Sequence, residues 1–124
     1  MQKIKFLEAY EINSSFYGDE HPIIASNLNN LGLISFVEGD YQDAKDKIMK
    51  SLEITLKNFG FVHKDNARGF INLGRINANL GFFPESEKNL NQAKEIFEQL
   101  FGINDLRTQN VLKIIEIVRR KEKY

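Results

Sequence analysis

The glycines of this 124-residue chain recur with one period. They fall at positions 18, 60 and 102, at 32 and 74, and at 39 and 81, so every interval within a set is 42 residues. Seven of the eight glycines obey this spacing. A fixed period of this length is typical of repeat proteins, in which each unit buries its apolar face only by packing on its neighbours. We therefore expect stacked copies of one supersecondary unit.

Between the glycines, apolar residues step by three and four positions, which is the spacing of an amphipathic helix. Leu28, Leu31 and Ile34 form one such series, and no stretch alternates with the period of two that a strand requires. Pro22 and Pro84 stand where a helix is expected to begin. The glycines that end these runs suit left-handed C-terminal caps. The pattern predicts helices over residues 3–17, 22–38, 41–58, 64–80, 84–100 and 104–122.

The connections after Gly39 and Gly81 are short, so each pair of helices that they join should be antiparallel. The repeating unit is then a helix hairpin, and its copies build an open solenoid. Gly32 and Gly74 are small enough to let two helix backbones approach closely. The residues expected to fill the space around them are Leu28, Leu31, Ile48, Phe70, Leu73 and Leu90. Aromatic residues at helix ends and turns are also expected in the core: Phe59, Phe82, Phe83, Phe97 and Phe101.

The order Leu31-Gly32, Gly39, Tyr41, Ala44 and Ser51 resembles the tetratricopeptide repeat (TPR), and the next period repeats most of it. The 42-residue period, with Gly-Asp-Glu-His-Pro before Ala-Ser-Asn-Leu-Asn-Asn-Leu-Gly, is similar to the repeats of kinesin light chains and related adaptor proteins. This resemblance implies an all-α superhelix, a TPR solenoid. Armadillo repeats have a similar length but use three helices, and two helical runs split by one glycine turn leave little room for a third.

The expected organisation is a single domain over residues 1–124, with a half-repeat at 1–21, repeats at 22–63 and 64–105, and a terminal half-repeat at 106–124. Two full hairpins are thus flanked by one unpaired helix at each end. Glu116 stands where Gly32 and Gly74 predict a third glycine. The last helix is therefore expected to stop the array.

Composition argues against several classes of function. Lys plus Arg and Asp plus Glu both number 17, so no net charge draws the chain to nucleic acid or to an anionic membrane. There is no cysteine, and His21 and His63 lack the spacing of a third metal ligand, so we expect them to serve helix starts. We predict no enzyme activity, no metal and no cofactor. The charged N-terminus lacks the apolar stretch of a signal peptide or membrane span, so a cytoplasmic location is expected.

The resemblance implies that the first helix of each hairpin lines a concave groove. The candidate groove residues are Asn29, Asn30, Leu33, Arg68, Asn72, Arg75, Asn79 and Lys113. Carboxamides both donate and accept, so they can hydrogen-bond the backbone of an extended peptide, and the cationic side chains would favour an acidic partner. The competing interpretation is an ordinary solvated polar face.

The two unpaired end helices carry more apolar residues than packing on one side can cover. The candidate oligomer surface consists of Phe6, Leu7, Tyr10, Ile114 and Ile117.

The resemblance and the candidate groove together predict a protein-interaction adaptor that binds a peptide or partner helix in its groove. The alternative is a structural or self-assembly module, either a homodimer or a piece of a longer repeat array.

Overall fold

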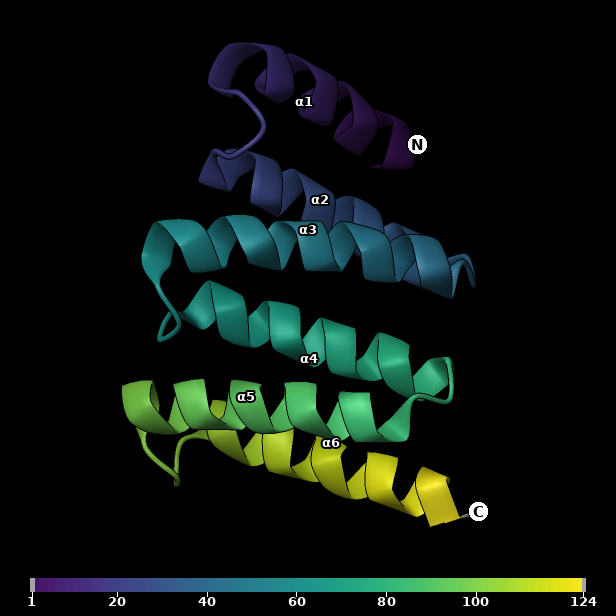
Figure 1. Cartoon of the computed structure of the whole chain (residues 1–124), viewed down its shortest axis with the longest axis vertical. Coiled ribbons are helices and arrows are strands. Elements are labelled where there is room, and N and C mark those ends of the chain that lie inside the picture. Colours follow the sequence, from purple (N-terminus) through teal and green to yellow (C-terminus); the bar gives the residue numbers. More distant parts are fainter. Residues whose placement is uncertain (1, 124) are drawn as a thin grey trace. The chain divides into compact units, whose positions relative to one another are not determined.

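A computed structural model describes residues 2–123, which form six α-helices and no strand (Figure 1). The helices are α1 (Gln2–Tyr17), α2 (Pro22–Val37), α3 (Tyr41–Phe59), α4 (Lys64–Asn79), α5 (Phe83–Phe101) and α6 (Leu106–Lys123). The predicted all-α helical-repeat class is confirmed. Every predicted helix boundary lies within about two residues of the observed one.

The chain forms two compact units, the first ending at Gly60 and the second beginning at Phe61. In the first unit α2 packs against α3, and α1 packs against α2. In the second unit α4 packs against α5, and α5 packs against α6. Each unit therefore contains one helix hairpin and one additional helix.

The two helices of each hairpin pack closely at a glycine of the first helix. A β-carbon added to Gly32 would lie 2.9 Å from Cδ1 of Ile48, and one added to Gly74 would lie 2.7 Å from Cγ of Leu90. Ile48 and Leu90 are fully buried. Near the second contact, the hydroxyl of Ser86 donates to the carbonyl oxygen of Gly74 at 2.6 Å. The prediction that these glycines permit close helix packing is confirmed.

Two kinds of glycine end the helices. At the short turn after α2, Gly39 has φ +85°, its N–H donates to the carbonyl of Phe36, and the N–H of Asp40 donates to that of Ser35. This pair of bonds is a Schellman motif, and its positive φ at Gly39 agrees with the left-handed cap that the sequence predicts. Gly60 also has positive φ, 74°, but its ψ is −179°, so the expected left-handed helical cap is wrong there. The chain leaves α3 extended, which suits the longer connection to the next helix.

The side chains that were expected to fill the hairpins are buried. They are Leu28, Leu31, Ile48, Phe70, Leu73 and Leu90. The aromatic residues at helix ends follow the prediction less well. Phe97 is buried, whereas Phe59 and Phe82 are exposed and Phe83 and Phe101 are half-buried. Phe59 is the last residue of α3 and Phe82 lies in a turn, so neither has a helix packed on all sides.

Candidate functional site

The two histidines cap helices. Nδ1 of His21 accepts a hydrogen bond from the backbone N–H of Ile23 at 3.1 Å, at the start of α2. Nδ1 of His63 accepts from the N–H of Asp65 at 3.1 Å, at the start of α4. These bonds satisfy backbone donors that have no partner within the helix. Within residues 2–123, no cluster of three His, Cys, Asp or Glu side chains could hold a metal ion.

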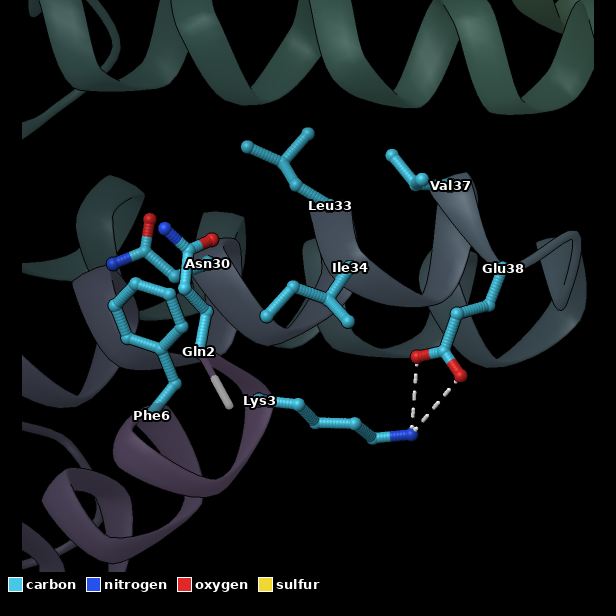
Figure 2. A pocket seen from close by; sticks show the side chains of 8 residues that line it. All are labelled: Gln2, Lys3, Phe6, Asn30, Leu33, Ile34, Val37 and Glu38. Atoms are coloured by element: carbon cyan, nitrogen blue, oxygen red, sulfur yellow. Dashed lines mark hydrogen bonds and ion pairs between the residues drawn. The ribbon is translucent and has the colours of Figure 1, made fainter.

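The first unit contains a groove of about 650 Å³ between α1 and α2 (Figure 2). Its lining comes from both helices: Gln2, Lys3 and Phe6 of α1, and Asn30, Leu33, Ile34, Val37 and Glu38 of α2. Residues 30, 33, 34 and 37 are spaced by three and four, so they form one stripe along α2. The groove is therefore lined by one face of each helix.

The groove has a different character at its two ends. At one end the ring of Phe6 lies beside the carboxamides of Gln2 and Asn30, as Figure 2 shows. At the other end Nζ of Lys3 lies 3.1 Å from Oε1 of Glu38, and both side chains are about half exposed. An ion pair exposed in this way contributes little stability, about 0–1 kcal/mol. It can therefore open for a ligand at small cost.

Aliphatic side chains lie between these two ends. Ile34 lies between the amide end and the ion pair, and Leu33 and Val37 project from the same side of α2 (Figure 2). Leu33 and Val37 are exposed, so they offer apolar surface to a ligand. An apolar wall beside amide donors and acceptors suits a peptide, whose side chains pack on the wall while its backbone bonds to the amides.

Two of the residues predicted from sequence to line a groove, Asn30 and Leu33, lie in this site. Asn29 is half-buried on α2 and does not line it. The other candidates belong to the second unit. Arg68, Asn72, Arg75 and Asn79 are on α4, and Lys113 is on α6.

The α4 candidates differ in their surroundings. Nη1 of Arg68 lies 3.8 Å from Oδ1 of Asp65, one turn earlier. Nδ2 of Asn79 donates to the carbonyl oxygen of Arg75 at 2.9 Å, so this carboxamide is engaged near the end of its own helix. Asn72 is half-buried, and Arg75 is exposed, as is Lys113 on α6. A role for these residues in binding stays a prediction.

The candidate oligomer surface is divided between interior and exterior. Tyr10 packs against the core cluster that contains Ile24 and Leu28, and Phe6 lines the groove. Leu7 and Ile117 are exposed. Ile114 is half-buried on α6. A role for this candidate surface in self-association also stays a prediction.

Sequence reasoning did not assign six lining residues to a groove: Gln2, Lys3, Phe6, Ile34, Val37 and Glu38. It gave one of them, Phe6, to the oligomer surface. The spacing of Asn30, Ile34 and Val37 was a usable signal, because it places one amide and two aliphatic side chains on one helix stripe. No local pattern indicates that Gln2 and Lys3 face that stripe. Their position depends on how α1 packs against α2.

The chain is similar to part of a known protein. No protein-family model matches the chain. It is 29% identical over 113 residues to a Clustered mitochondria protein homolog of Candida albicans. The match covers 91% of this chain but 8% of that protein, so the chain spans a small part of the length of its relative. The chain is thus similar to one short stretch of a much longer protein.

None of the helices within residues 2–123 is both long and apolar enough to cross a membrane.

Proposed function

We propose that the chain is a non-catalytic protein-interaction module whose groove between α1 and α2 binds a peptide. The helical-repeat fold supports this role, because such folds present extended surfaces to protein partners. The match to a short stretch of a Clustered mitochondria protein homolog is in keeping with a module that serves a larger protein. We further propose that the repeats are TPRs of the kinesin-light-chain type and that the module acts in the cytoplasm.

The observation that carries the proposal is the groove itself. It joins the aromatic ring of Phe6 and the aliphatic side chains of α2 to the carboxamides of Gln2 and Asn30. An extended peptide would place an apolar side chain on Leu33 and exchange backbone hydrogen bonds with Asn30. This arrangement recognises a peptide by shape and main chain, with little demand on its sequence.

The second unit carries candidate binding residues of its own. Asn72 stands one repeat after Asn30, and Arg75 and Lys113 are exposed cations. Cationic side chains favour carboxylates, so we propose that the preferred partner is acidic or ends in a C-terminal carboxylate. Replacing Arg75 with Glu should then weaken binding of acidic peptides and leave that of neutral ones unchanged.

Panning a phage-displayed peptide library on the whole chain tests the groove. Three proteins are used as bait: the wild type, Leu33→Glu, and Met49→Glu as the matched control. Met49 is exposed on α3 and does not line the groove. Circular dichroism first establishes that all three have the same helical content.

We expect peptides that are enriched on the wild type and on Met49→Glu but lost on Leu33→Glu. An apolar side chain of a bound peptide would bury the carboxylate of Leu33→Glu without a partner, which is unfavourable. Equal enrichment of the peptides on Leu33→Glu and on the wild type would contradict the groove as the binding site. Failure of every bait to enrich any peptide would contradict peptide binding as the function.

Self-assembly is the second candidate function, favoured by the exposed apolar residues Leu7 and Ile117 on the end helices. In that case the wild type would form a homodimer, and Leu7→Glu or Ile117→Glu would return it to a monomer. Light scattering coupled to size exclusion, over micromolar concentrations, distinguishes this function from peptide binding by a monomer.

A further inference from the structure

One face of α1 is apolar and uncovered within the first unit. The exposed fractions of Ile12 and Phe16 are 64% and 81%, and these residues lie one turn apart. The face that contacts α2 is a different one, because Tyr10 packs on the core there and Asn13 donates to Asn27 at 3.2 Å. We name the surface formed by Ala9, Ile12 and Phe16 the open face of α1.

The repeat shows what covers this face elsewhere. Ile54 follows Ile12 by one period; it is 2% exposed and packs in the core cluster with residues of α2. Ile96 follows by two periods and is fully buried, as is Ala93, the counterpart of Ala9. On α3 and α5 the positions of Ala9 and Ile12 are thus buried, whereas the counterparts of Phe16, Asn58 and Leu100, are exposed. On α1 these positions have no helix to meet among the described residues.

The helices that cover the buried positions share a sequence pattern. In α2 it is Ala25, Leu28, Leu31 and Gly32, and in α4 it is Ala67, Phe70, Leu73 and Gly74. The pattern is Ala-x-x-(Leu or Phe)-x-x-Leu-Gly. Its glycine is required, since even a β-carbon at Gly32 would lie 2.9 Å from the Ile48 side chain. On α1 the position of Ile48 is held by the larger Phe6, so a helix that docks there needs glycine at least as much.

Among its residues 2–123, a second copy of this chain offers no uncovered helix with this pattern. The small-residue faces of α2 and α4 are occupied by α3 and α5. α6 follows the same repeat position but carries Gln109 and Glu116 in place of the alanine and glycine. A glutamate side chain cannot fit at the close contact, and burying its charge would be costly. The described residues of a second copy therefore do not supply the matching helix.

We propose that the open face of α1 docks an amphipathic helix of another protein that carries the pattern Ala-x-x-(Leu or Phe)-x-x-Leu-Gly. The helix would lie antiparallel to α1 and complete a hairpin like α2–α3. Its glycine would pack at Phe6, and its apolar residues would cover Ile12. This surface adjoins the peptide groove at Phe6, which lines that groove, whereas Ile12 and Phe16 do not.

A fluorescein-labelled peptide with the sequence of residues 62–82 of this chain serves as the probe, since it contains α4 and its pattern. Fluorescence anisotropy measures its binding to the whole chain, to Ile12→Glu, and to Ile4→Glu as the matched control. Ile4 is as exposed as Ile12 within a few per cent, 58% against 64%, but lies on another face of α1. A second peptide carries Gly74→Glu.

We expect saturable binding that Ile12→Glu and the Gly74→Glu peptide each weaken by about tenfold or more, while Ile4→Glu leaves it within about twofold. Equal weakening by Ile4→Glu, indifference to Gly74→Glu, or no binding at the solubility limit of the peptide would overturn the proposal. A wild-type dimer that Ile12→Glu converts to a monomer would also overturn it, because a second copy would then cover the face. Ile12→Glu should keep the panning enrichment that Leu33→Glu loses, and Leu33→Glu should keep the binding of the labelled helix, so the two variants separate this surface from the groove.

Discussion

Arg107 holds Asp105 at three points where α6 begins. Nε and Nη2 of the guanidinium donate to Oδ1 and Oδ2 of Asp105 at 2.9 and 3.0 Å, and the backbone N–H of Arg107 donates to Oδ1 at 2.9 Å. Asp105 stands one period after His63 and two after His21, and all three side chains accept from the N–H two residues on. The repeat thus keeps the capping geometry while it changes the chemistry of the cap.

Removal of the Arg107 side chain should raise the pKa of Asp105. The side-chain hydrogen bonds from Arg107, then its backbone N–H, lower this pKa from 3.8 to about 2. Because the pKa of Asp105 is lower in the folded state than in the unfolded state, its ionised carboxylate stabilises the fold at pH values above the unfolded-state pKa. That stability is lost as the pH falls through about 2. In Arg107→Ala this contribution should be smaller and should be lost at a higher pH, because the folded-state pKa then lies closer to the usual value of about 4.

Carboxyl ¹³C NMR titration of the wild type and of Arg107→Ala measures this shift. Asp43, whose pKa is lowered first by the hydrogen bond from Lys47, is the internal control, and its pKa should be the same in both proteins. An unchanged Asp105 pKa in Arg107→Ala would mean that the backbone bond alone depresses it.

His63→Ala should lower the free energy of unfolding by about 1 kcal/mol, because the N–H of Asp65 loses its acceptor. His63→Asp should keep most of the stability, since Asp105 shows that a carboxylate serves at this repeat position. Urea denaturation followed by circular dichroism measures both. Equal losses in the two variants would indicate that His63 stabilises the protein through contacts other than its cap.

Gly74→Ala should destabilise the chain more than Gly32→Ala. The added β-carbon meets Cγ of Leu90 at 2.7 Å, near the base of a fully buried side chain, whereas at Gly32 it meets Cδ1, the tip of the Ile48 side chain. Overpacking of this kind costs about 1–3 kcal/mol, offset by up to about 1 kcal/mol from the better helix propensity of alanine.

Thermal unfolding of the two single variants and of Gly74→Ala with Leu90→Ala tests this explanation. Shortening Leu90 removes the clash, so in that background the cost of Gly74→Ala should vanish or change sign. A cost that persists without the Leu90 side chain would place the strain in the backbone contact with Ser86, whose oxygen lies 3.3 Å from the added carbon.

Ile54→Ala and Ile12→Ala change the same position of two successive repeats and should have very different effects. Ile54 lies in the core, so its truncation should cost about 2–5 kcal/mol. Ile12 is exposed, so its truncation should change the free energy of unfolding by less than about 0.5 kcal/mol. Chemical denaturation at low protein concentration makes the comparison. A large cost for Ile12→Ala would show that α1 is covered in the isolated protein.

Sequence patterns predicted the helices well because local chemistry decides where they end. Gly39 supplies a positive φ at a tight turn, and Asp40 then caps α3 by accepting from the N–H of Asp43 at 3.2 Å. Where two local signals compete, the prediction is less accurate. A start at residue 104 was expected for α6, but Asp105 acts as the cap and the helix begins at Leu106.

The candidate site was harder to predict because it is a tertiary feature. The spacing of α2 places Asn30 and Leu33 near one another, but only the packing of α1 adds Phe6 and Lys3 as a facing wall. Repeat periodicity also cannot show burial at an end of the array. Phe6 occupies the repeat position of the fully buried Ile48, yet it is half-buried beside the groove because no helix precedes it among the described residues.

One wall of the groove is a weakly anchored helix. Within residues 2–17, α1 contributes no buried side chain. Segments with few buried contacts open locally at low free energy, so the amide hydrogens of α1 should exchange with solvent sooner than those of α2. When α1 detaches, the groove is lost with it. A ligand that fills the groove therefore also fastens this helix, and slower amide exchange along α1 would report occupancy without any label on the ligand.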